Sequence, residues 1–132
     1  MANLSNANFQ VDILTGMPDT YQVTGTVNVE LSQFETNLVV LLGLPLELQA
    51  DLWGEDAGLN GTDDHLFSFT SQSVTRPGTY TFSAIVPRGV LNEDSSWFDN
   101  TDEVYNRFTL TSGSNFFPVN IATNSPEITG IF

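Results

Sequence analysis

The sequence predicts an all-β fold, namely one antiparallel β-sandwich of seven to nine strands that spans residues 1–132. Apolar and polar residues alternate with a period of two over most of the chain, as in strands that bury one face. Turn-forming residues separate these segments at the short intervals expected of a sandwich. The chain is 40% hydrophobic and contains ten Phe, which suffices for one buried core and leaves little room for a second domain.

The first three predicted strands occupy residues 8–15, 20–34 and 38–42. The first places Phe9, Val11 and Ile13 on one face. The second alternates over its whole length, and a bend is expected at Gly25. Its apolar face comprises Tyr21, Val23, Val27, Val29 and Leu31. Residues 38–42 are continuously apolar, which indicates a fully buried strand.

Five further segments alternate, at residues 46–52, 65–70, 79–86, 104–111 and 115–123. Pro118 indicates that the last of these lies at a sheet edge, since proline cannot donate to a central ladder. Residues 128–132 are either a short final strand or a docking tail. The pattern does not determine strand order, so C2-like, transthyretin-like and immunoglobulin-like topologies all fit, with a closed barrel as the structural alternative.

The charge balance excludes several classes of partner. Sixteen Asp and Glu oppose three basic residues, giving a formal net charge of −13. A nucleic-acid binder needs a Lys/Arg face, and docking to an anionic membrane needs the same. The absence of Cys excludes disulfides, thiolate metal sites and thiol nucleophiles.

The first residues lack the basic and apolar regions of a Sec signal peptide. The acidic, Lys-free and Cys-free composition nevertheless favours an extracellular, cell-surface or virion location over a cytoplasmic one.

Eleven of the sixteen carboxylates fall within residues 47–64 and 93–103, both of which contain predicted inter-strand loops. Such clusters repel one another unless a cation lies between them. Calcium takes six to eight hard oxygens from flexible loops. The first segment therefore predicts a calcium site whose ligands are Glu55, Asp56, Asn60, Asp63 and Asp64. An EF-hand is excluded, because Gly58 and Phe67 occupy two of its ligand positions.

A strand ending in Leu52-Trp53 is followed by Glu55-Asp56, a Gly/Asn loop, Asp63-Asp64 and a hydrophobic strand. This order resembles the third calcium loop of C2 domains over roughly 20 residues. The resemblance implies an eight-stranded sandwich in which Asp56 and Asp64 hold calcium, with Glu55 or Asp63 as substitutes. The chain departs from that family because it has no matching upstream aspartate loop and no basic lipid-binding patch, so lipid binding is not expected.

The second acidic segment offers a different ligand chemistry. Trp97 could stack on a sugar ring while Asp99 and Asp102 bind hydroxyl groups, and Trp53 or Tyr105 could contribute a second ring. The simpler interpretation is that Trp97 or Phe98 closes one end of the core, because tryptophan is usually largely buried.

Catalytic signatures are weak. His65 is the only histidine, which makes a histidine zinc site impossible, and no nucleophile elbow accompanies it. We therefore expect a surface histidine at a strand start.

The sequence predicts a non-enzymatic binding or structural assembly module, stabilised by calcium, that engages a protein partner or another copy of itself. The alternatives are a carbohydrate-binding sandwich and a metal-free structural or virion subunit that assembles through edge strands or termini.

Overall fold

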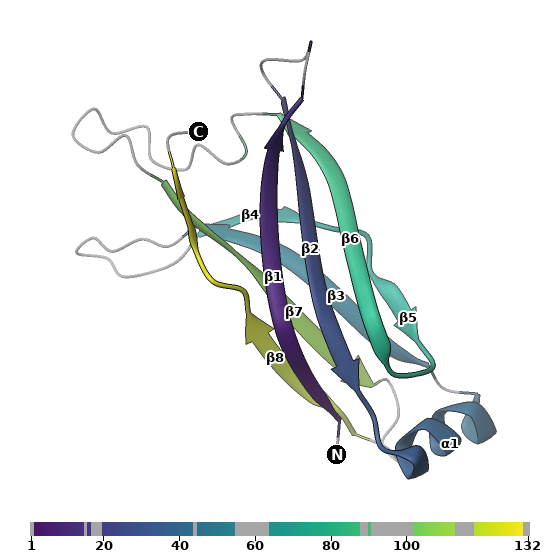
Figure 1. Ribbon diagram of the computed structural model, residues 1–132. Coiled ribbons are helices and arrows are strands. Elements are labelled where there is room, and N and C mark those ends of the chain that lie inside the picture. The colour runs from purple at the N-terminus through teal and green to yellow at the C-terminus, as the bar shows by residue number, and fades with distance from the viewer. Residues whose placement is uncertain are drawn as a thin grey trace.

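The computed structural model shows two antiparallel sheets packed face to face and joined at one end by a short helix (Figure 1). It describes residues 2–14, 16, 20–43, 45–54, 64–87, 90, 102–112 and 118–130. The described residues form nine strands, which confirms the predicted antiparallel all-β sandwich.

The first sheet contains three strands in the order β1 (Asn3–Ile13), β2 (Thr20–Glu30) and β6 (Gly78–Pro87). Strand β2 lies in the centre and buries the side chains at every second position, as its alternation predicts. The register between β2 and β6 runs through Gly25 without a shift.

The second sheet contains six strands. Its main order is β4 (Asp64–Ser68), β3 (Leu46–Gly54), β7 (Asp102–Ser112) and β8 (Asn120–Asn124). Strand β5 (Gln72–Val74) also pairs with β3, and β9 (Ile128–Gly130) also pairs with β7. Strand β8 ends this order, which agrees with the edge position that Pro118 indicated.

Strand β1 differs from its prediction because it contains a bulge. Asn6 adopts a left-handed φ of 52°, a conformation that asparagine tolerates better than most residues. The register with β2 shifts between Ser5 and Asn8. The shift moves the inward face from Leu4 to Ala7, Phe9 and Val11. Ile13 keeps the register of this face, as predicted, because it pairs with the inward-facing Tyr21, but its side chain is 77% exposed at the strand end.

The predicted strand at residues 38–42 was wrong, because helix α1 (Gln33–Leu42) occupies this part of the chain. The Ser32 Oγ accepts a hydrogen bond from the Glu35 N–H at 3.1 Å, and the Glu35 carboxylate accepts one from the Ser32 N–H at 2.9 Å. This capping box starts the helix. Gly43 ends it with a φ of 62°. Strand β2 consequently stops at Glu30 rather than continuing to residue 34.

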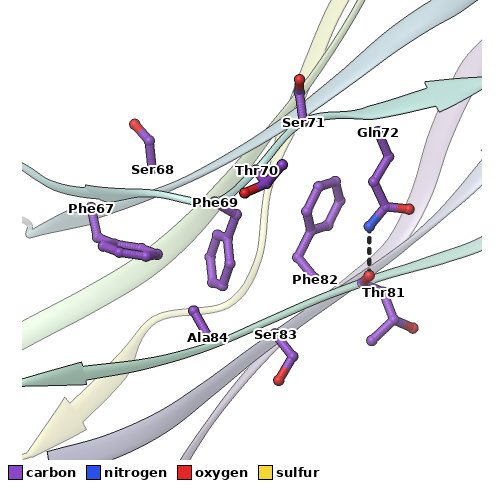
Figure 2. A pocket seen from close by; sticks show the side chains of 10 residues that line it. All are labelled: Phe67, Ser68, Phe69, Thr70, Ser71, Gln72, Thr81, Phe82, Ser83 and Ala84. Carbon is purple, nitrogen blue, oxygen red and sulfur yellow. Dashed lines mark hydrogen bonds between the residues drawn. The ribbon is translucent and has the colours of Figure 1, made fainter.

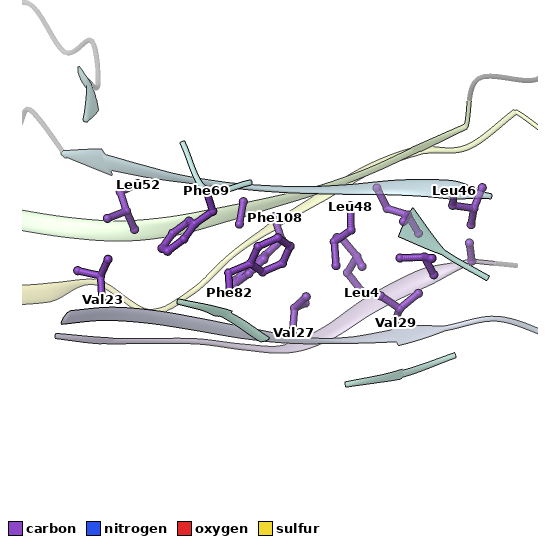
Figure 3. Packing of buried hydrophobic residues seen from close by; sticks show 14 of the residues in the cluster. Leu4, Val23, Val27, Val29, Leu46, Leu48, Leu52, Phe69, Phe82 and Phe108 are labelled. Atoms are coloured by element: carbon purple, nitrogen blue, oxygen red, sulfur yellow. The ribbon is translucent and has the colours of Figure 1, made fainter. Parts of the chain in front are cut away.

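The core lies between the two sheets, and Figure 3 shows its packing. Strand β3 contributes Leu46, Leu48 and Leu52, which face the valines of β2 across the sandwich. The rings of Phe69, Phe82 and Phe108 pack in a row, with successive centroids 5.9 and 6.1 Å apart. This row links β6 to the second sheet at mid-height.

One polar side chain lies inside this core. Asn106 of β7 is fully buried, and within the described part of the chain neither its Nδ2 nor its Oδ1 has a hydrogen-bond partner. It faces Gly25 of β2, which has no Cβ and so leaves space for the amide. The Asn106 backbone is better satisfied, because its N–H donates to Ser125 Oγ at 2.9 Å and its carbonyl accepts from the Ser125 N–H at 2.8 Å.

Candidate functional site

Helix α1 lies at one end of the sandwich, where β2 of the first sheet leads into β3 of the second. It projects beyond the strand ends at the lower right of Figure 1. Only Glu35 and Val39 of the helix are buried. Most of the helix surface therefore points away from the sandwich.

The surface that α1 presents to solvent is largely apolar. Phe34 is 71% exposed and Leu41 is 82% exposed, and Val40 and Leu42 are exposed as well. Phe34, Leu38 and Leu41 follow one another at spacings of four and three residues, so they lie on one side of the helix. We call these three residues the α1 stripe. A concentration of large apolar side chains on a surface usually marks an interaction site.

The only charged side chain of α1 does not lie on this exposed surface. Glu35 is its only charged residue, and it is only 7% exposed. Burial raises the pKa of the Glu35 carboxyl, but the hydrogen bonds that it forms, foremost with Ser32, outweigh burial and lower that pKa overall. The carboxylate therefore stays ionised inside its cap, and the exposed face of the helix is uncharged.

The acidic segments leave the sandwich at the opposite end. Gly54, the last residue of β3, pairs with both Asp64 of β4 and Val104 of β7. The end of β3 and the starts of β4 and β7, which border residues 55–63 and 91–101, consequently lie side by side. Nine of the sixteen carboxylates belong to residues 55–64 and 93–103. The sandwich thus has an acidic end and an apolar end, separated by the length of β3.

Most of the predicted ligands lie outside the described residues, namely Glu55, Asp56, Asn60, Asp63, Trp97 and Asp99. Asp64 opens β4 and Asp102 opens β7, so the backbone brings both to the acidic end. The part of the chain that the structure describes contains no group of three His, Cys, Asp or Glu side chains placed to hold a metal. Tyr105 is buried, so its ring has little surface for stacking on a sugar.

The single histidine joins a small polar cluster on the outer face of β3 and β4. His65 Nε2 lies 2.9 Å from Ser68 Oγ and 3.2 Å from Asp51 Oδ1, and Ser68 Oγ donates to Asp51 Oδ1 at 2.6 Å. In a serine triad the hydroxyl and the carboxylate bind opposite ring nitrogens. Here both contact Nε2 and the serine donates directly to the aspartate, so the cluster is not arranged to activate the hydroxyl. The cluster links β3 to β4 from His65 to Ser68, and His65 lies near the strand start, as expected of a surface histidine.

A groove of about 400 Å³ lies between β6 and the β4–β5 edge (Figure 2). Phe67, Phe69 and Phe82 form its floor, and its rim carries hydroxyl groups. Gln72 Nε2 donates to the Thr81 carbonyl at 2.7 Å and so ties the two sheets together across the groove. Phe69 and Phe82 are already buried in the core. The groove therefore offers a ligand little apolar surface.

The α1 stripe is the feature that reasoning from the sequence missed. The signals were present in the chain, since Ser32 and Glu35 have the capping-box spacing and Gly43 follows at a suitable distance. The apolar run at residues 38–42 matches a buried strand and a short helix equally well, and periodicity alone does not separate the two.

The chain matches no known protein-family model, and no curated protein sequence matches it either. No helix in the described ranges is both long and apolar enough to cross a membrane.

Proposed function

We propose that this protein is a non-enzymatic binding or structural assembly module that docks onto a protein through the α1 stripe. The observation that carries this proposal is the exposure of Phe34 and Leu41 on a helix whose only charge is buried. Fully burying one such side chain contributes about 1.5–3 kcal/mol. Both residues retain most of their surface in the free chain. A partner that buries them therefore gains most of this free energy from each side chain.

The test uses a neutral environment-sensitive dye such as Nile red, since an anionic dye would be repelled by the chain. The Phe34→Ser/Leu41→Ser variant should lose most of the dye fluorescence of the unaltered protein. It should keep the same melting temperature, because neither side chain belongs to the core. The matched control is Ile13→Ser/Ile85→Ser, which removes two exposed apolar side chains from the first sheet and should retain the dye signal.

Two results would contradict the proposal. Unchanged dye binding in the α1 variant would show that the stripe is not an accessible apolar surface. A fall in melting temperature as large as that of a core truncation would show that Phe34 and Leu41 stabilise the sandwich.

A second role, stabilisation by calcium at the acidic end, is favoured by the pairing of Gly54 with both Asp64 and Val104. That pairing gathers the flanks of both acidic segments, so that one cation could neutralise carboxylates from each. The cation would order the loops at this end. The carbohydrate-binding alternative has no comparable support, and an extracellular, cell-surface or virion location stays a prediction from composition.

The calcium proposal is tested by thermal melts in EDTA, calcium and magnesium. At 100 times its dissociation constant calcium adds about 2.7 kcal/mol, which for a domain of this size raises the melting temperature by on the order of 10 °C. Magnesium should have little effect, and Asp56→Asn with Asp64→Asn should abolish the shift. Glu47→Gln, at the α1 end of β3, is the control and should keep it. Equal melts in EDTA and calcium would refute the site.

A further inference from the structure

We infer that the partner of the α1 stripe is a second copy of this chain, bound with the two helices antiparallel about a twofold axis. This inference rests on the proposed function, because it names the occupant of the same surface. Three features support it, namely the spacing of the stripe, the distribution of charge and the size of the surface.

The spacing makes the stripe complementary to itself. Phe34 and Leu41 are seven residues apart, with Leu38 near the midpoint. When two such helices pack antiparallel, Phe34 of each copy meets Leu41 of the other, and the two Leu38 side chains meet near the axis. This isologous arrangement is the commonest form of homodimer interface. Helix recognition commonly uses anchor residues at these spacings.

The charge distribution selects the α1 end for contact between like chains. Two copies of net charge −13 repel each other, but the exposed face of α1 is uncharged. Along the chain this end is flanked by two acidic residues, Glu30 and Glu47, and by one basic residue, Arg76, which follows β5. The nine residues of β3 span about 30 Å, so the strand ends at Gly54 and Asp64, which lead into the acidic segments, lie much farther from α1 than a Debye length of about 8 Å.

The same distribution argues against other occupants. A basic protein would be attracted to the acidic end rather than to α1. A membrane-surface helix carries Lys or Arg beside its apolar face, and α1 contains neither. A second copy needs no complementary charge, because it brings the same uncharged face.

The size of the surface limits the expected affinity. The α1 stripe offers on the order of 300 Å² of apolar surface per copy, because Val40 lies about 120° around the helix from Phe34 and does not join the same contact. This area is below that of a standard specific interface. We therefore expect a weak dimer, with a dissociation constant on the order of 0.1 mM.

Sedimentation equilibrium of the full chain tests this inference, over a range of about 5 µM to 1 mM that brackets the expected dissociation constant. The unaltered chain should pass from monomer to dimer, and Phe34→Ser/Leu41→Ser should stay monomeric. Ile13→Ser/Ile85→Ser should behave like the unaltered chain. Raising sodium chloride from about 0.15 to 0.5 M should change the dissociation constant little, because the acidic segments are already screened from each other at the lower salt concentration.

The antiparallel register has its own test. Chains carrying Phe34→Lys and chains carrying Leu41→Glu should each remain monomeric alone. Their mixture should form a heterodimer, because the lysine then meets the glutamate and one Phe34–Leu41 contact is restored. A mixture that remains monomeric, while the unaltered chain dimerises, would overturn the antiparallel register.

The outcomes separate the two proposals. A chain that stays monomeric at every concentration, yet loses dye binding in the α1 variant, would overturn the second copy and leave the docking surface intact. A dimer that survives Phe34→Ser/Leu41→Ser would overturn the inference by locating the contact elsewhere. A monomer whose dye binding does not depend on α1 would overturn both.

Discussion

Gly25 of β2 lies inside the sandwich opposite Asn106 of β7, and the Gly25→Ala variant adds a methyl group to that contact. A Cβ at position 25 would lie 1.9 Å from Asn106 Nδ2 and 3.1 Å from Phe108 Cζ. Ordinary Cβ contacts fall at 3.4–4 Å, so the amide must move by about 1.5 Å. Asn106 is fully buried, which leaves it no open space to enter.

The expected cost follows from two opposing terms. Overpacking a closed core lowers the free energy of unfolding by about 1–3 kcal/mol. Gly→Ala raises it by about 0.4–1 kcal/mol, because alanine restricts the unfolded chain. We therefore expect the free energy of unfolding to fall by about 1–2 kcal/mol, with a melting temperature lower by about 4–8 °C.

Equilibrium urea unfolding of a double-mutant cycle measures this effect. Asn106→Ala removes the amide that collides with the new methyl group, and it also removes a buried polar group without a partner. The Gly25→Ala/Asn106→Ala variant should be more stable than the sum of the single changes, with a coupling energy of about 1 kcal/mol or more. Thr26→Ala, the next position on β2 and on the outer face, is the control and should cost less than Gly25→Ala. A coupling energy below about 0.5 kcal/mol would refute the contact.

Three further predictions concern the core and the helix cap. Leu48→Ala, at a fully buried position of β3, should cost about 2–5 kcal/mol in urea unfolding. Ser32→Ala should cost about 1 kcal/mol through loss of the α1 cap, and amide exchange should accelerate within Gln33–Leu42 more than in β3; equal protection would show that the capping box does not hold the helix. The pKa of Glu35 is lowered in the folded state, so its stabilisation is present above the unfolded pKa and is lost as the pH falls through the lower folded value. The difference in stability between the unaltered chain and Glu35→Gln should therefore be greatest near neutral pH and shrink below about pH 4; a constant difference would contradict the assignment.

The regular strands were predictable because one buried face imposes a period of two. Residues 46–52, 79–86 and 104–111 all lie within strands β3, β6 and β7. The pattern fails where a single residue breaks the period. The left-handed Asn6 shifts the inward face of β1 by one position. The alternation of apolar and polar residues alone does not predict that bulge.

The ends of the sandwich were harder to predict than its faces. At the α1 end, the capping interactions of Ser32 and Glu35 decide between helix and strand, although the apolar run suggested burial. At the acidic end, the sequence identified two clusters of carboxylates but not their relation, because that depends on strand order. The pairing of Gly54 with both Asp64 and Val104 supplies the missing information.

The buried amide of Asn106 illustrates a different limit. It lies on the inward face of β7 between Val104 and Phe108, all three being buried. That the space it occupies is provided by a glycine on the opposite sheet is a contact between strands far apart in sequence, and no local pattern encodes it.

Association of the protein through α1 is tested most directly by NMR. A concentration series of two-dimensional ¹H–¹⁵N NMR spectra, from about 20 µM to 1 mM so that it brackets the dissociation constant of a weak dimer, locates any contact at residue level. We predict shift changes concentrated at Phe34, Leu38 and Leu41, with none at the strand ends around Gly54 and Asp64. Spectra that do not change with concentration, or changes centred on the acidic end, would contradict association through α1.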